Sequence, residues 1–360
     1  MRRRRFLTTA ALGLAGVCMR HGLNGSSQSA SPAFSTDLGP VHSIIPVVGD
    51  GKWIWKEPPE KDRGYLEPRS YELKIGIEMT GVGEQSEALA ATPVPLAHPE
   101  QVVDDVRLEK EGCEATIREL APGAGQLLMH VPALRKGETV RAIAHYKLTL
   151  SKQYHAYAAE MFPVAQRVPQ EIKNLALFDS PGIQTSAPAV KKLAAELSQG
   201  IVHPWDKAVA FAAWIREHIR PQIGPFTSVT TALEKRLGDC EEYSAVFVAL
   251  CRAAEIPARL VWVPNHNWSE FYLTDDKGVG HWIPVHTACY GWFGWTGVHE
   301  LVIQKGDRVK VREQHATFRL LEDWLRSTGR KPQTTYVAEL TPLPPKTDAD
   351  PGPGAAKERQ

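Results

Sequence analysis

The ten residues from Gly238 to Phe247, Gly-Asp-Cys-Glu-Glu-Tyr-Ser-Ala-Val-Phe, place a cysteine at the first turn of a predicted helix. Asp239 can act as the N-cap, and Glu242, three residues later, can complete a capping box. The helix is expected to end near Pro257, because the residue before a proline avoids helical backbone angles. Apolar residues recur at helical spacing, which predicts a buried face made of Tyr243, Val246, Phe247, Leu250, Cys251 and Ala254.

Cys240 therefore lies at the N-terminal end of a helix that is anchored in the core. The N–H groups and the positive end of the helix dipole favour the thiolate, which is the nucleophilic form of cysteine. A single cysteine near a helix start can equally be a small buried residue with no chemical role. The segment that follows the helix favours the first interpretation.

Two further motifs follow a predicted strand at 258–263. They are His266-Asn267-Trp268-Ser269-Glu270 and Trp282-Ile283-Pro284-Val285-His286. Together with Gly238-Asp239-Cys240 they resemble the transglutaminase-like superfamily, whose ordered motifs are Gly-x-Cys, His-x-Trp-x-Glu and Trp-x-Pro-x-Asp. The resemblance covers about residues 181–312. The sequence departs from the family at the last position, where His286 replaces the aspartate.

The resemblance implies a papain-like catalytic triad of Cys240, His266 and His286. His266 would deprotonate Cys240, or form an ion pair with its thiolate, and would then protonate the leaving amine. His286 would accept a hydrogen bond from the second ring nitrogen of His266, but a neutral imidazole supplies no negative charge. We therefore expect weaker activity than an aspartate would give, or a loss of catalysis. The backbone N–H of Cys240 is the expected first oxyanion donor, and the sequence identifies no second one.

Cys240, His266, His281 and His286 could alternatively bind zinc, for which cysteine and histidine are suitable ligands. The sequence lacks a close Cys-x-x-Cys or His-x-x-x-His pair among them. We therefore expect no metal and no cofactor.

The first 30 residues are predicted to be an export signal. Arg2 to Arg5 precede a short apolar run that ends at Val17, which is typical of a secretory signal. The alternatives are an uncleaved anchor or a fortuitous basic tail. Arg3-Arg4-Arg5-Phe6-Leu7 resembles a twin-arginine motif. The protein is therefore expected in the periplasm or outside the cell, with membrane contact only during export, and the net charge of +1 gives no reason to expect a nucleic-acid partner.

The chain predicts an α+β protein with two folded domains. A tether at 31–64 leads to an antiparallel β-sandwich at 65–150, a linker at 151–180, a catalytic domain at 181–340 and a disordered tail at 341–360. Alternation at Tyr71–Met79 predicts a half-buried strand, and more strands are expected at 102–108, 114–120, 126–131, 139–150, 301–303 and 308–311. Helices are expected from a Ser186 cap to Gly200, from Pro204, over 231–236 and over 318–325.

Four cysteines remain after removal of the signal: Cys113, Cys240, Cys251 and Cys289. Cys240 and Cys251 cannot pair on one helix, because they would be about 16 Å apart. A bridge between Cys251 and Cys289 is conceivable in an exported protein.

The predicted activity is acyl transfer from a peptide or side-chain amide through a thioester on Cys240. The outcome depends on the acceptor: water gives a peptidase or amidase, and an amine gives cross-linking. Hydrolysis is the preferred interpretation, because bacterial-type relatives of the family are often hydrolytic. The alternative is a catalytically weak or inactive domain that binds a protein or peptide.

Overall fold

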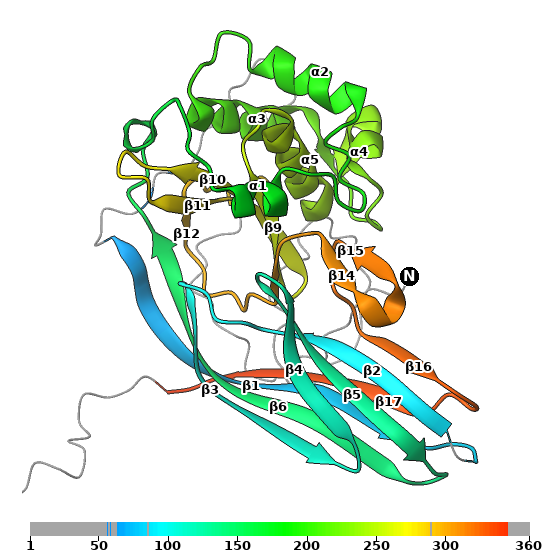
Figure 1. The fold of residues 1–360 in the computed structure, drawn as a ribbon. Helices are drawn as coiled ribbons and strands as arrows, with labels where there is room; N and C mark the ends of the chain where they lie inside the picture. Colours follow the sequence, from blue (N-terminus) through cyan, green and yellow to red (C-terminus); the bar gives the residue numbers. More distant parts are fainter. Residues whose placement is uncertain (1–55, 57, 59–62, 85, 289, 345–360) are drawn as a thin grey trace, which may run out of the picture.

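The computed structural model describes residues 56, 58, 63–84, 86–288 and 290–344 (Figure 1). The predicted signal, nearly all of the tether, Cys289 and most of the predicted tail lie outside these residues. Helices gather at one end of the molecule and long strands at the other (Figure 1). No helix in the described part of the chain is long and apolar enough to cross a membrane.

The first part of the described chain consists of long strands that pair antiparallel with one another. They are β1 (Gly64–Thr80), β2 (Ser86–Val94), β3 (Gln101–Glu111), β4 (Glu114–Ala121), β5 (Ala124–Leu134) and β6 (Thr139–Tyr154). All but β2 were expected from the sequence. The sequence of β2 does not indicate a strand, because alanine, which recurs in it, is a weak strand former. Alternate β1 side chains from Tyr71 to Met79 are buried against Leu127, Met129 and Val131 of β5. The two sheets therefore enclose the apolar core of a sandwich.

Both sheets of the sandwich take strands from the C-terminal half of the chain. One sheet has the order β12-β6-β1-β17 with β3 also on β6, and it includes β12 (Trp295–Thr296) and β17 (Gln333–Pro342). The other has the order β11-β10-β9-β13-β5-β2-β16 with β4 on β5. Its later strands are β9 (Ala258–Val263), β10 (His266–Thr274), β11 (Gly280–Val285), β13 (Gln304–Lys305) and β16 (Trp324–Ser327). The domain limits at 65–150 and 181–340 stay a prediction, since hydrogen-bonded sheets cross them.

The helical end packs on the strands β9 to β11. It comprises α1 (Gln170–Ala176), α2 (Pro188–Leu197), α3 (Pro204–His218), α4 (Val229–Lys235) and α5 (Cys240–Ala253). Short pairs of strands are formed by β7 (Arg220–Pro221) with β8 (Leu237–Gly238) and by β14 (Val309–Val311) with β15 (Ala316–Phe318). Single 3₁₀ turns occur at Ala159–Met161 and Arg312–Gln314.

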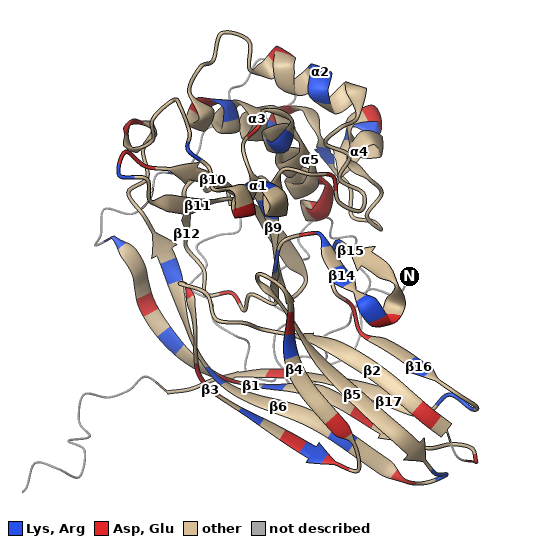
Figure 2. Cartoon of the chain, viewed as in Figure 1, with Lys and Arg blue, Asp and Glu red and all other residues tan. Residues whose placement is uncertain are grey.

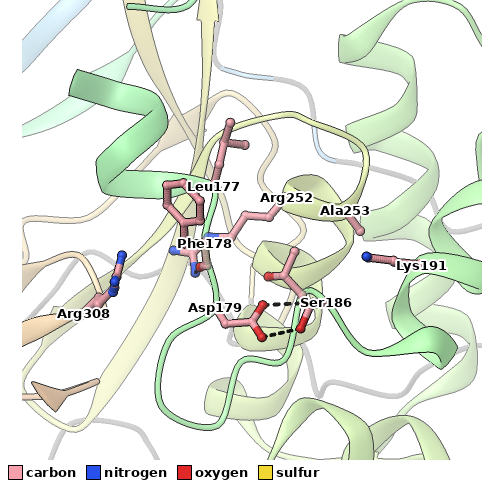
Figure 3. Close-up of a pocket in the computed structure, with 9 residues that line it drawn as sticks. Leu177, Phe178, Asp179, Ser186, Lys191, Arg252, Ala253 and Arg308 are labelled. Atoms are coloured by element: carbon pink, nitrogen blue, oxygen red, sulfur yellow. Dashed lines mark hydrogen bonds between the residues drawn. The ribbon is translucent and has the colours of Figure 1, made fainter. Parts of the chain in front are cut away.

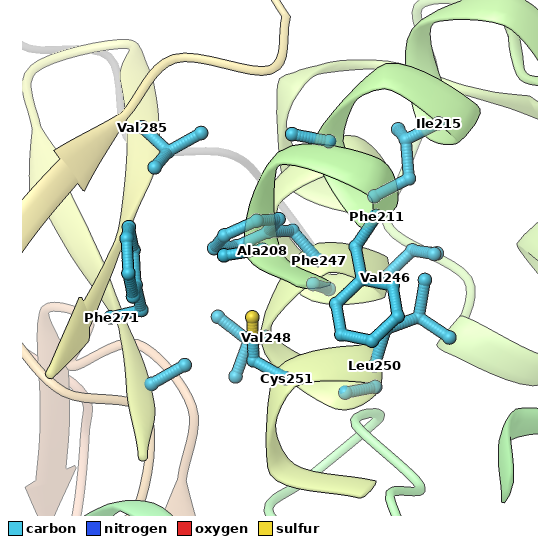
Figure 4. Packing of buried hydrophobic residues seen from close by; sticks show 14 of the residues in the cluster. Ala208, Phe211, Ile215, Val246, Phe247, Val248, Leu250, Cys251, Phe271 and Val285 are labelled. Atoms are coloured by element: carbon cyan, nitrogen blue, oxygen red, sulfur yellow. The ribbon is translucent and has the colours of Figure 1, made fainter. Parts of the chain in front are cut away.

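The central helix α5 is buried between α3 and β10. Phe247 lies on the side of Phe271 of β10, and Val246 lies with Phe211 and Ile215 of α3 (Figure 4). This apolar packing supplies most of the stability of α5, since intrinsic helix propensity alone contributes little. Cys251 carries a free thiol and is fully buried in the same cluster.

Four local expectations were wrong. Residues 301–303 were expected to form a strand, but the strand in this region, β13, begins only at Gln304. Residues 318–325, expected to form a final helix, instead run from the last residue of β15 to the second residue of β16. Trp324 and its neighbours pair with the edge of β2, and this tertiary pairing outweighs local propensity. α2 has Ala187 as its N-cap, and Ser186 instead donates its hydroxyl to Asp179 at 2.6 Å. β17 extends to Pro342, so the first two residues of the expected disordered tail are a strand.

Charged side chains of both signs are interspersed along the strands of the sandwich (Figure 2). Arg141 on β6, for example, contacts Glu109 and Glu111 on the neighbouring β3 at 3.0 and 2.9 Å. Such exposed pairs contribute little to stability.

Candidate active site

Cys240 is the first residue of α5, as the sequence predicted. The Asp239 side chain accepts from the N–H of Glu241 at 3.0 Å. Glu242 accepts from the N–H of Asp239 at 3.0 Å, which completes the capping box. A Cβ at Gly238 would come within 2.3 Å of the Cβ of Glu242. The glycine before the cysteine is therefore a packing requirement of this tight entry into the helix.

His266 begins β10, and this strand is fixed directly to α5. The buried hydroxyl of Ser269 donates to the carbonyl of Ser244 at 3.1 Å. Ser244 lies one turn after Cys240 and Ser269 lies three residues after His266, so the bond holds the starts of the helix and the strand in register. Nε2 of His266 is buried and makes no hydrogen bond in the described structure.

The surroundings of His266 favour its neutral form. Burial lowers the pKa of His266 to about 4, and the carboxylate of Asp239 opposes this shift. The N-cap beside the nucleophile is thus close enough to His266 to stabilise its charged form. His266 is neutral at physiological pH and can accept a proton.

His286 follows β11 and is 1% exposed. Its ring stacks on Trp268 with centroids 4.9 Å apart, and it meets the edges of Tyr290 and Trp292 at 5.5 and 5.1 Å. Its Nε2 lies 3.1 Å from the hydroxyl of Thr296, while its Nδ1 is buried without a hydrogen bond. Burial lowers the pKa of His286 well below its ordinary value, and the nearby His266 lowers it further. His286 is therefore a neutral ring in an aromatic cage.

The rings of His266 and His286 lie near each other without a direct hydrogen bond. Their centroids are 6.2 Å apart and their planes are inclined by 21°. Of the ring nitrogens, Nε2 of His266 and Nδ1 of His286 have no partner in the described structure, and Nε2 of His286 faces Thr296 instead. The expected hydrogen bond between the two histidine rings is therefore absent from the described part of the chain.

The loop after His286 is held by a residue that the sequence did not reveal. Arg216 on α3 is 1% exposed, and its Nη1 donates to the carbonyls of Thr287 and Ala288 at 3.0 and 2.6 Å. Nothing in the sequence distinguishes Arg216 from a solvated arginine on an amphipathic helix.

Glu270, the last residue of the His-x-Trp-x-Glu motif, belongs to a buried ionic cluster. It bonds Arg259 at 2.6 Å and Lys305 at 2.7 Å. Lys305 also contacts Glu100, just before β3, at 2.6 Å. Burial alone would raise the pKa of Glu270, but Lys305 and Arg259 outweigh it and hold the pKa at about 2. The motif glutamate thus links the strand of His266 to the sandwich.

The residues considered as zinc ligands do not form one site. His281 bonds Asp275 at 3.0 Å. Among residues 56, 58, 63–84, 86–288 and 290–344, no group of three or more His, Cys, Asp and Glu side chains is arranged to hold a metal ion. Cys113 and Cys240 take part in no disulfide among the described residues. Cys289, the other half of the conceivable bridge to Cys251, lies outside the described residues.

A cavity of about 450 Å³ opens at the opposite end of α5. Arg252 and Ala253, the last residues of the helix, line it together with Asp179, Lys191 and Arg308 (Figure 3). Ala253 lies thirteen positions after Cys240 in the helix, which corresponds to about 20 Å. This cavity is therefore not the place where an acyl group could meet the thiol.

Comparison with known proteins identifies one family in part of the chain. Residues 191–287 match the model of the transglutaminase-like superfamily, and the match contains Cys240, His266 and His286. No curated protein matches the chain significantly.

Two solved structures match the chain, of which the first is similar in fold. One is a proposed cysteine protease from Cytophaga hutchinsonii, 18% identical, with a TM-score of 0.51 over 78% of this chain and 92% of that chain. The other is a proposed protease from Parabacteroides distasonis, 11% identical, with a TM-score of 0.25 over 58% of this chain and 42% of that chain. The chain thus contains a transglutaminase-like domain, and the expected α+β fold is confirmed.

Proposed function

We propose that the transglutaminase-like domain transfers the acyl group of a peptide bond or side-chain amide to Cys240, and that water is the usual final acceptor. The observation that carries this proposal is the position of Cys240. It is the first residue of a capped, buried helix that is tied to the strand of His266 through Ser244 and Ser269.

The reaction begins with a proton transfer from the Cys240 thiol to His266, which is neutral because its pKa is about 4. The sulfur attacks the amide carbon, and the backbone N–H of Cys240 donates to the oxygen that becomes negative. The imidazolium of His266 then gives its proton to the leaving amine, and a thioester remains. Water, deprotonated by His266, attacks the thioester, and the carboxylic acid leaves while the thiol is restored.

Asp239 provides part of the support that an aspartate at position 286 would give. Its carboxylate favours the imidazolium of His266, which forms after each proton transfer. Charge stabilisation therefore comes from the side of the helix N-cap, whereas His286 fills the aromatic cage and is held by Thr296.

The second candidate function is a domain that binds peptides without turnover. The missing hydrogen bond between His266 and His286, together with the neutral state of His286, favours it. An unsupported His266 would be a weak base and would leave Cys240 as an ordinary thiol.

We propose in addition that the protein acts in the periplasm or outside the cell. The basic residues Arg2 to Arg5 and the short apolar run up to Val17 support this proposal. The expected substrate is a peptide or protein, and neither a nucleic acid nor a lasting membrane contact is part of the proposal.

The alkylation rate of Cys240 by iodoacetamide tests the proposed function. We expect faster labelling than for a free thiol at pH 6, and a rate that falls at least tenfold in His266→Ala. Cys240→Ala gives the background from Cys113, Cys251 and Cys289. A slow rate that His266→Ala leaves unchanged would favour the binding domain.

The choice of acceptor is tested separately with a glutamine-containing peptide and a fluorescent primary amine. Hydrolysis releases ammonia and leaves the peptide unlabelled. Incorporation of the amine as the main product would replace the hydrolytic proposal with cross-linking.

A further inference from the structure

Lys56, which precedes the sandwich, contacts a loop that forms part of the site. The N–H of Lys56 donates to the carbonyl of Gly291 at 2.9 Å. The indole Nε1 of Trp295 donates to the carbonyl of Lys56 at 3.1 Å. Both backbone polar groups of Lys56 are thus bound, while its side chain is exposed. Lys56 forms an isolated parallel β-bridge with Trp292. It is therefore bound in the way that one residue of an added strand would be.

The partner loop is itself an extension of the sheet that carries the site. Val285 pairs with Phe293, and the N–H of His286 donates to the carbonyl of Trp292 at 2.9 Å. One edge of the loop is therefore bound to the end of β11, and Lys56 occupies its other edge. Extended peptides commonly bind proteins by adding a strand to such an edge.

This edge is directly connected to the two histidines. Tyr290 and Trp292, on either side of Gly291, stack on each other with centroids 4.1 Å apart. Both rings meet His286, and Tyr290 also meets the ring of His266 at 6.3 Å. A chain bound at Gly291 therefore lies beside the aromatic residues that surround the proposed general base.

We propose that the Gly291 carbonyl and the Trp295 indole form a peptide-binding edge of the active site, and that the chain's own segment at Lys56 occupies it. This inference rests on the proposed acyl transfer from a peptide. An extended peptide substrate makes the same two backbone hydrogen bonds and must first displace Lys56. The Lys56 side chain is exposed, so the edge recognises only the peptide main chain. It therefore accepts any residue that has a backbone N–H at this position.

The test compares two reagents that alkylate Cys240. Iodoacetamide is too small to need the edge, whereas a tripeptide chloromethyl ketone must lie along it. Lys56→Pro removes the N–H that binds Gly291, and Lys56→Ala is the matched control that keeps both backbone bonds. We expect the peptide reagent to label Lys56→Pro about three- to tenfold faster than the unaltered chain, which is the effect of one hydrogen bond. Lys56→Ala and all iodoacetamide rates should be unchanged.

A synthetic peptide of residues 51–60 provides the second measurement. It should slow labelling of Lys56→Pro by the peptide reagent and leave labelling by iodoacetamide unaffected. The same competition in the unaltered chain, at higher peptide concentration, replaces this test if Lys56→Pro does not fold.

The outcomes separate the two proposals. Equal peptide-reagent rates in Lys56→Pro and the unaltered chain, with rapid iodoacetamide labelling, overturn the peptide-binding edge and leave the acyl transfer intact. Slow iodoacetamide labelling in every variant overturns the acyl transfer, and the peptide-binding edge with it.

Discussion

Nε2 of His286 lies 3.1 Å from the hydroxyl of Thr296, a residue of the short strand that pairs with β6 of the sandwich. The third position of the predicted triad is therefore held by the sandwich sheet rather than by His266. The sandwich contributes directly to the geometry of the site, and the following predictions begin with this contact.

Thr296→Val should destabilise the protein by about 1–3 kcal/mol, because it leaves the Nε2 of the buried His286 unpaired. Both ring nitrogens would then lack a partner. Urea unfolding measures the change, and Thr317→Val, at an exposed position of β15, is the control. A loss no larger than that of the control would mean that the Thr296 contact is unimportant.

His286→Asp should raise the pKa of His266 above its present value of about 4, because it adds a buried negative charge. The smaller side chain also leaves part of the aromatic cage empty, so we expect a loss of stability of about 2–4 kcal/mol. NMR titration of His266 measures the first effect. A pKa that stays at about 4 would show that a charge at position 286 does not reach His266.

Asp239→Asn should lower the pKa of His266 further while the helix cap is preserved, since asparagine caps as well as aspartate. Asp239→Ala should have the same effect on the pKa and should cost about 1 kcal/mol more in stability. Comparing the two variants separates the effect of the Asp239 charge from the effect of its role as a helix cap. An unchanged His266 pKa in both would remove Asp239 from the proposed mechanism.

Lys305→Met should destabilise the protein by about 3–5 kcal/mol, because it leaves Glu270 and Glu100 buried without their shared cation. Lys310→Met, at an exposed position of β14, should cost less than about 0.5 kcal/mol. Thermal or urea unfolding distinguishes the two variants. Equal losses would mean that the cluster does not stabilise the fold.

Stability should decrease as the pH falls below about 6.5, the pKa of histidine in an unfolded chain. His286 stays neutral in the folded protein because its pKa is lowered, so the unfolded chain binds more protons in this range. Each such histidine adds a slope of up to about 1.4 kcal/mol per pH unit. His286→Asn should reduce the slope between pH 6.5 and 5, and an equal slope in both proteins would argue against a neutral, buried His286.

The sequence predicts the elements of the site better than the contacts between them. Local patterns reveal the helix of Cys240 and the strand of His266, because capping residues and periodicity are encoded within a few residues. The stacking of His286 on Trp268 and its bond to Thr296 depend on how distant strands pair. Arg216 is recognised only when its carbonyl partners are in place.

The segments near the C-terminal end of the described chain are likewise hard to predict from sequence alone. The stretch around Trp324 gives no local indication of a strand, and its edge position beside Ala91 is decided by the rest of the sheet. The buried role of Glu270 likewise depends on Lys305, which lies on a two-residue strand too short to predict.

The pairing of β1 with β17 also has a consequence for biosynthesis. Tyr71 faces Pro342 across this sheet, so β1, which ends at Thr80, lacks one neighbour until β17, which begins at Gln333, has been made. The edge of β1 is exposed to wrong partners during that time, and its closure is a slow, non-local step. Any chaperone or export machinery that meets the chain before β17 has been made therefore encounters β1 with that edge still open.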